Sequence, residues 1–170
     1  IPEVPQHQEN MYQFVAARKG ISYARSIAMH GHVAKMAKDA GLDYHFDKML
    51  ATNSLKAHRL IQMAKTKGLG EKAEECLFYA YFTEGKNLSD DAVLTELGNN
   101  IGLTNAEVKE ALTNPVFKEK VEADGAEASR LGAKGVPFFV IDRKYAIAGA
   151  QPGAEMLKVL QTAYANGTGR

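Results

Sequence analysis

The sequence predicts an α/β protein in which a helical subdomain precedes a small unit of two strands and one helix. Three observations support this fold class. Residues 8–130 follow the 3–4 spacing of apolar positions and the capping signals of helices. Residues 138–142 and 145–149 are short apolar runs rich in aromatic and β-branched residues, which favour strands. A proline, Pro137, stands directly before the first of these runs and marks a special turn.

The composition allows one domain with a hydrophobic core, or one domain with a helical insertion. The chain has 170 residues, of which 45% are hydrophobic, and its 21 basic and 20 acidic residues give a formal charge of +1. Neither sign forms a long run, so we expect no nucleic acid and no anionic membrane as partners. No apolar stretch approaches the roughly 20 residues that span a bilayer.

The first helix is expected over residues 9–19, where Gly20 supplies the left-handed conformation that ends many helices. Ser22 is a preferred N-cap residue for a longer helix, which Gly41 ends. Apolar residues of this second helix keep a 3–4 spacing: Ile27, Val33, Met36 and Ala37. Residues 42–52 are predicted to be irregular.

Two more helices are expected over residues 53–68 and 71–85, with Asn53 or Ser54 at the start of the first. Residues 76–82 are apolar nearly all round the second helix, which predicts a place at the centre of the helical layer. Contiguous aromatic residues here favour the core over a peptide-binding platform, and these residues are Phe78, Tyr79, Tyr81 and Phe82.

The last helices of the subdomain carry distinct start signals. Ser89 is expected to cap the next helix. Thr104 and Glu107 have the spacing of a capping box, in which each side chain satisfies a free backbone N–H of the other residue. Pro115 opens the last long helix, which is expected to end near Gly132.

The turn before the first strand has the properties of a substrate-binding loop. An X-Pro bond adopts the cis form at a small cost, and Val136 before Pro137 is restricted to extended conformations. The backbone of Val136 is therefore free to face a group outside the sheet. Gly149 and Pro152 then lead from the second strand into a helix.

Four segments resemble the FrnE branch of the DsbA-like thiol-disulfide oxidoreductases. They are residues 53–60 (NSLKAHRL), 77–85 (LFYAYFTEG), 136–139 (VPFF) and 149–152 (GAQP). The resemblance extends over residues 41–163 and implies a thioredoxin-like, DsbA-type fold with an inserted helical subdomain. It implies three regions: a remnant of the N-terminal half with a connector at 1–20, the helical insertion and linking helix at 21–131, and the C-terminal ββα half at 132–170.

The Cys-x-x-Cys motif that defines this family has no counterpart in the chain, whose only cysteine is Cys76. Residues 1–5 resemble the stretch just after the second strand of the family. We therefore expect that the N-terminal half of the fold is missing and that the redox pair lies upstream of Ile1. The two predicted strands support this expectation independently, because an isolated two-stranded hairpin is marginally stable in water.

Cys76 is predicted to be a small buried residue rather than a redox group. It lies in the middle of a helix beside Glu75, where the carboxylate and burial both raise the pKa of a thiol. A regulatory or metal-binding thiol is the alternative. A single cysteine excludes an intrachain disulfide, so we expect no catalytic residue in this chain and no oxidoreductase activity from it alone.

The resemblance implies substrate-binding roles for Val136 and Pro137. They would form a cis-proline loop facing the redox pair, and the backbone before the proline would pair with an extended substrate peptide. His58 would be an accessory group that stabilises a thiolate, or else a residue that caps or bridges helices. The amide of Gln151 would reach either the thiol site or the following helix.

No cofactor or metal site is predicted from the other histidines. His30 and His32 are two residues apart on a helix, so their rings point to different faces and are expected to face solvent. His45 lies between Tyr44 and Phe46 in the irregular stretch. It either lines a groove or packs against these rings.

The predicted function is that of a protein thiol-disulfide oxidoreductase acting on protein or peptide substrates in the cytoplasm, with a homodimer as a further expectation. A related alternative is an enzyme like hydroxychromene-carboxylate isomerase or kappa glutathione transferase. The sequence Gly149-Ala150-Gln151-Pro152 favours the oxidoreductase, because the isomerases are expected to have a Gly-x-Asp-Arg-type sequence there. A non-catalytic peptide-binding module is the third alternative.

Overall fold

The computed structural model describes residues 9–167, which form two compact units that meet in the chain between Val121 and Glu122. The fold is mostly helical, with one small two-stranded sheet among the described residues. The expectation based on residues 1–5 lies outside these residues. The region boundaries predicted at 20/21 and 131/132 stay predictions.

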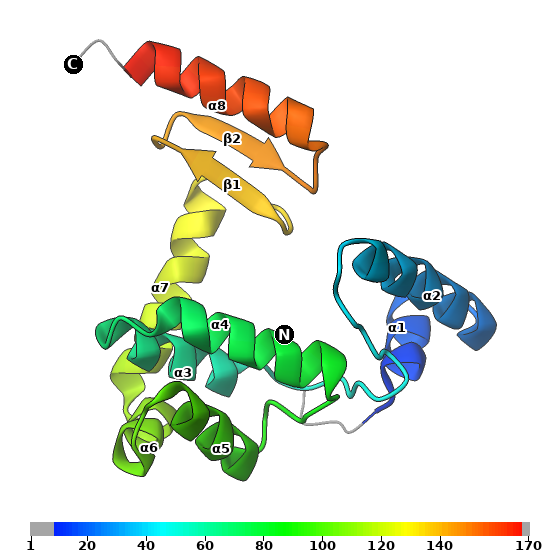
Figure 1. The fold of residues 1–170 in the computed structure, drawn as a ribbon, viewed down its shortest axis with the longest axis vertical. Helices are drawn as coiled ribbons and strands as arrows, with labels where there is room; N and C mark the ends of the chain where they lie inside the picture. The colour runs from blue at the N-terminus through cyan, green and yellow to red at the C-terminus, as the bar shows by residue number, and fades with distance from the viewer. Residues whose placement is uncertain (1–8, 168–170) are drawn as a thin grey trace. The chain divides into compact units, whose positions relative to one another are not determined.

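The first unit consists of helices and their connections (Figure 1). The elements are α1 (Met11–Lys19), α2 (Tyr23–Asp39), α3 (Leu55–Thr66), α4 (Gly70–Phe78), the π-helical turn η1 (Tyr79–Thr83), α5 (Asp91–Ile101), α6 (Asn105–Thr113) and the first part of α7 (Pro115–Arg130). Local capping explains several of these bounds. Ser22 accepts a hydrogen bond from the Arg25 N–H, and Thr104 and Glu107 form the predicted capping box.

The core of this unit lies between α3, α4, α5 and α6, which pack as neighbouring pairs (Figure 1). Leu60, Leu94 and Val108 are at most 1% exposed and come from three different helices. Phe117 adds the first turn of α7 to the same cluster. Burial of such side chains contributes about 1.5–3 kcal/mol each and accounts for the packing of short helices that would be unstable alone.

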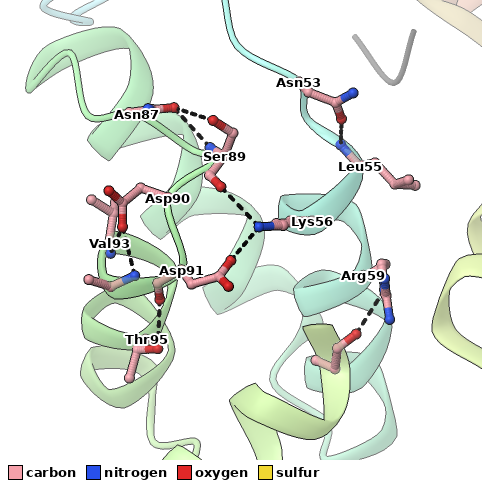
Figure 2. Close-up of polar contacts among 12 residues, drawn as sticks. Asn53, Leu55, Lys56, Arg59, Asn87, Ser89, Asp90, Asp91, Val93 and Thr95 are labelled. Carbon is pink, nitrogen blue, oxygen red and sulfur yellow. Dashed lines mark hydrogen bonds and ion pairs between the residues drawn. The ribbon is translucent and has the colours of Figure 1, made fainter. Parts of the chain in front are cut away.

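The start of α5 corrects one prediction, because Asp90 and not Ser89 caps this helix. The Asp90 carboxylate accepts hydrogen bonds from the N–H groups of Ala92 and Val93, at 2.7 and 3.3 Å (Figure 2). The Ser89 hydroxyl instead donates to the side-chain oxygen of Asn87 over 2.7 Å. Ser89 lies one residue too early for its oxygen to reach the first free N–H groups.

The predicted continuous helix over residues 71–85 is also wrong, because α4 passes into η1 at Tyr79. The Glu84 N–H donates to the Tyr79 carbonyl, five residues earlier, which is the π-helical pattern. Leu77 and Ala80 are buried, whereas Phe78 and Tyr79 are 56% and 60% exposed. The predicted central place therefore holds for one side of the run only, since Leu77 and Ala80 belong to the core while Phe78 and Tyr79 face solvent.

Helix α2 is covered on one side only. Ser26 and Ala37 are buried, but Ile27, Val33 and Met36 are 42%, 44% and 59% exposed. The 3–4 spacing predicts the helix correctly, while the exposure of its apolar residues depends on neighbouring segments that the spacing does not specify.

The second unit contains the hairpin of β1 (Phe138–Ile141) and β2 (Tyr145–Ala148), with α8 (Gly153–Gly167) lying along it (Figure 1). The strands are antiparallel and pair Phe138 with Ala148. Each ends one residue before its predicted end, because Asp142 and Gly149 have positive φ angles of 51° and 79°.

None of the helices within residues 9–167 is both long and apolar enough to cross a bilayer. The cytoplasmic location and the homodimer stay predictions.

Candidate functional site

The loop before β1 presents Val136 to solvent. Val136 is 94% exposed, and its peptide bond to Pro137 is cis. The carbonyl of Pro137 accepts a hydrogen bond of 2.8 Å from the Gly149 N–H, which fixes the loop to the end of β2. The apolar side chain of Val136 therefore projects from a backbone that is held in place on its C-terminal side.

The backbone of Val136 is available for pairing. Within residues 9–167, neither its N–H nor its carbonyl makes a hydrogen bond. An exposed backbone donor and acceptor next to a strand are the groups with which proteins bind extended peptides by strand addition. The arrangement can therefore hold a peptide main chain without any charged side chain.

Gln151 lies at the same end of the hairpin as the Val136 loop. Its side-chain amide donates to the Ala148 carbonyl over 3.0 Å, and Ala148 pairs with Phe138 directly after Pro137. The sequence suggested that this amide reaches either the thiol site or the following helix. It contacts neither of them and instead fixes the turn after β2. Its accessory role stays a prediction.

His58 belongs to the first unit and is exposed on α3. Two charged residues of the segment 53–60, Lys56 and Arg59, connect α3 to other helices (Figure 2). The Lys56 ammonium contacts the Asp91 carboxylate at 2.6 Å, and the Arg59 Nε donates to the Ala111 carbonyl over 2.9 Å. The accessory role of His58 stays a prediction, while Lys56 and Arg59 have clear roles in joining α3 to α5 and α6.

Cys76 lacks the surroundings of an activated thiol. Its side chain is half-buried in α4, packs against the helical core, and has its Sγ 4.0 Å from the Leu97 carbonyl. Burial raises the pKa of this thiol; the Lys86 ammonium opposes the rise, and the carboxylates of Glu84 and Glu96 add to it. The predicted direction agrees with this, but the carboxylates that contribute are Glu84 and Glu96 rather than the predicted Glu75, and the side chain is half-buried rather than buried.

The histidines within residues 9–167 do not gather into a metal site. His30 is half-buried, with its ring 5.2 Å from Tyr12 and 4.8 Å from Phe46, and its Nδ1 lies 2.8 Å from the Ser26 carbonyl. The prediction that this histidine faces solvent is therefore wrong, because two aromatic rings distant in sequence enclose it. Among the described residues, no three histidine, cysteine or carboxylate side chains are close enough to share a metal ion.

His45, whose role the sequence left open, contacts a carboxylate. Its Nε2 lies 3.0 Å from the Asp43 carboxylate, and its Nδ1 lies 4.0 Å from that of Asp47. Both contacts lie within the irregular stretch after α2, and both carboxylates are exposed.

Sequence reasoning missed one further surface, formed by the exposed aromatic residues Phe78 and Tyr79. The signal was present, since the apolar run 76–82 is wider than one buried helix face requires. The prediction that these aromatic residues belong to the core is wrong for both.

A ββα unit that is entered through a Val-Pro loop and follows a helical unit agrees with the fold that the sequence resemblance implied. The family model described as DSBA-like thioredoxin domain matches residues 6–165, so the chain belongs to this family. The chain is also similar in structure to a probable DsbA oxidoreductase from Streptomyces coelicolor, with a TM-score of 0.90 and 30% sequence identity. That match covers 96% of this chain and 71% of the other chain. No curated protein matches the chain.

Proposed function

We propose that this chain is the substrate-presenting part of a protein thiol-disulfide oxidoreductase of the FrnE branch. The observation that carries the proposal is the exposed backbone of Val136, whose donor and acceptor make no hydrogen bond within the described residues. An extended peptide pairs with these groups, which brings a substrate disulfide or thiol to a fixed position. Membership of the DsbA-like family supplies the class of reaction.

The exchange reaction itself needs two thiols, and this chain contains one cysteine, Cys76. A thiolate attacks one sulfur of a substrate disulfide, forms a mixed disulfide and releases the other sulfur as a thiolate. The second thiolate of the pair then attacks the mixed disulfide, which leaves the enzyme oxidised and the substrate reduced; the opposite direction uses the same steps. We propose that the redox pair is encoded upstream of Ile1 and that Cys76 takes no part.

The proposal is tested by insulin reduction with dithiothreitol, using the 170-residue chain, its Cys76→Ala variant and the product of the complete coding sequence. The two short chains should match the uncatalysed rate, because neither contains a redox pair. The complete product should be faster, and its activity should survive Cys76→Ala. Activity of the short chain that Cys76→Ala abolishes would overturn the role assigned to the upstream pair.

A matched pair of variants in the complete product tests the role of Val136. Val136→Pro removes the backbone N–H, whereas Val136→Ala keeps it and removes most of the side chain. If the substrate backbone pairs at this position, Val136→Pro should raise KM for a peptide disulfide about tenfold. Val136→Ala should change KM much less. Equal effects of both variants, with unchanged thermal unfolding, would contradict backbone pairing.

A further inference from the structure

A surface pocket in the first unit contains none of the residues assigned to the proposed peptide exchange. It encloses about 300 Å³ between the stretch that follows α2 and the junction of α4 with η1. Leu42, Phe78 and Tyr79 line it and are 50%, 56% and 60% exposed. Large apolar side chains exposed around one hollow are characteristic of binding sites, because a folded chain otherwise buries such surface.

Contacts within the unit hold the walls of this pocket in place. The His45 N–H donates to the Phe82 carbonyl over 2.8 Å, and the Thr83 hydroxyl donates to the Asp43 carbonyl over 2.7 Å. The rings of Tyr44 and Phe82 are stacked, with centroids 4.5 Å apart. The pocket is therefore formed before any ligand arrives, which lowers the entropy cost of binding.

Two successive aromatic residues border the pocket at the junction of α4 with the π-helical turn η1. Leu77 and Ala80 are three residues apart, share one helix face and are buried, whereas Phe78 and Tyr79 between them are exposed. Such turns are uncommon and often occur at functional sites.

The charge around the pocket selects the kind of ligand. Among residues 9–167, the charged residues that line it are Asp43 and Glu75, and both are exposed acidic side chains. The Asp43 carboxylate already lies 3.0 Å from the His45 Nε2, so Glu75 is the carboxylate more open to a ligand. In the part of the chain that the structure describes, no lysine or arginine lines the pocket, although the whole chain carries a formal charge of +1. Carboxylates beside aromatic faces attract a cation and repel phosphate groups.

We infer that this pocket docks a segment of a partner protein in which a large apolar side chain adjoins an arginine or lysine. The apolar side chain lies against Leu42, Phe78 and Tyr79, and the cation lies near Glu75 and an aromatic ring. This docking surface belongs to the first unit, whereas Val136 belongs to the second. Binding at this surface would make the protein prefer partners with particular side chains. Backbone pairing at Val136 gives no such preference, because it does not depend on the side chains of the bound peptide.

Fluorescence anisotropy with the 170-residue chain and three short labelled peptides tests this inference. The first peptide carries Leu-Arg pairs in a Gly-Ser background, the second has Glu in place of Arg, and the third has Ser in place of Leu. The first peptide alone should bind, and added salt should weaken its binding because exposed charges are screened. Equal binding of the Glu peptide would overturn the inference.

Protein variants locate the binding. Glu75→Lys and Tyr79→Ser should each weaken binding of the first peptide about tenfold, and Glu75→Gln should weaken it less. The matched controls Glu119→Lys and Tyr164→Ser change exposed residues elsewhere and should bind as the unchanged chain does. Binding that is lost in Val136→Lys but kept in Glu75→Lys would place the peptide at the other site and overturn the inference.

Sedimentation of the same variants distinguishes a partner protein from a second copy of this chain. A dimer that Tyr79→Ser dissociates, together with absent binding of the Leu-Arg peptide, would show that self-association covers the pocket and would overturn the inference. Unchanged sedimentation of the variant, with weakened peptide binding, supports it.

Discussion

Arg59 closes the C-terminal end of α6 by donating from its Nε to the carbonyl of Ala111 over 2.9 Å. Its Nη2 also donates to the Asn114 carbonyl over 3.0 Å. The last carbonyls of a helix have no partners within the helix, and a cation there also interacts favourably with the helix dipole. Arg59 is half-buried, so this contact between α3 and α6 is partly protected from water.

Replacing Arg59 with methionine should lower the free energy of unfolding by about 2 kcal/mol. Methionine keeps an apolar stem of similar length but cannot donate to either carbonyl. Urea denaturation followed by circular dichroism measures the change. The control Arg25→Met alters an exposed arginine on α2 and should stay within about 0.5 kcal/mol of the unchanged chain. Similar losses in both variants would show that the carbonyl contacts do not stabilise the fold.

Gly98 in α5 is buried directly against Val108 of α6, where a Cβ atom would overlap the valine Cγ2. Gly98→Ala should therefore destabilise the chain by about 1–3 kcal/mol through overpacking. The double variant Gly98→Ala/Val108→Ala should lose less stability than the sum of the two single changes, because the smaller side chain removes the overlap. Additive losses in thermal unfolding would exclude this explanation.

Gly31 in α2 provides the opposite case. It is exposed, and a Cβ atom there would meet nothing within 4 Å. Gly31→Ala should raise the free energy of unfolding by about 0.5–1 kcal/mol, since alanine has the higher helix propensity. A loss of stability in the same thermal unfolding experiment would indicate a contact at this helix position that the structure does not contain.

Glu107 should make stability depend on pH in the acid range. The Lys67 ammonium, then the N–H and hydroxyl of Thr104, lower the pKa of this carboxyl from 4.5 to about 2. Because the pKa is lower in the folded state, the stabilisation is present above pH 4.5 and is lost as the pH falls toward 2. Glu107→Gln removes the charge, and its deficit in stability should therefore be constant above about pH 5 and shrink below it.

Urea denaturation of both proteins across the acid range measures this deficit. Glu119→Gln, which changes an exposed glutamate, is the control and should show no comparable trend. A deficit for Glu107→Gln that stays constant down to pH 2 would contradict the lowered pKa.

Cys76 should react slowly with iodoacetamide at neutral pH in the folded chain. Burial raises the pKa of its thiol above the ordinary value of 9.0, so the reactive thiolate is scarce, and packing in α4 restricts access. The same chain unfolded in urea should react faster. The rate, followed by mass spectrometry, should keep rising with pH beyond 9.0 in the folded state. Equal rates in the folded and unfolded chains would contradict burial of the thiol.

Much of the secondary structure was predictable because its signals are local. Thr104 and Glu107 are three residues apart, and each needs only the other's backbone to form the capping box. The strands around Phe139 and Ile147 follow from short apolar runs between turn residues. At the start of α5, Ser89 and Asp90 are adjacent, and both residue types are preferred N-caps. Only the backbone positions in the structure show that Asp90 is the one that caps the helix.

The candidate site was predictable in part for the same reason. The exposed loop at Val136 follows from the restriction that Pro137 imposes on its neighbour. The contact of Gln151 with the Ala148 carbonyl depends on the turn at Gly149 and could not be chosen from the sequence.

The sequence by itself determined the helical unit, the ββα unit, the single cysteine and the loop at Val136, since each depends on residues close together in the chain. Only the tertiary structure decided that His30 packs between Tyr12 and Phe46, and that Phe78 and Tyr79 face solvent around a pocket. The physical reason is that burial is set by contacts between segments far apart in sequence. Apolar spacing gives a helix its faces, but the neighbours that cover each face are specified by the packing of the whole unit.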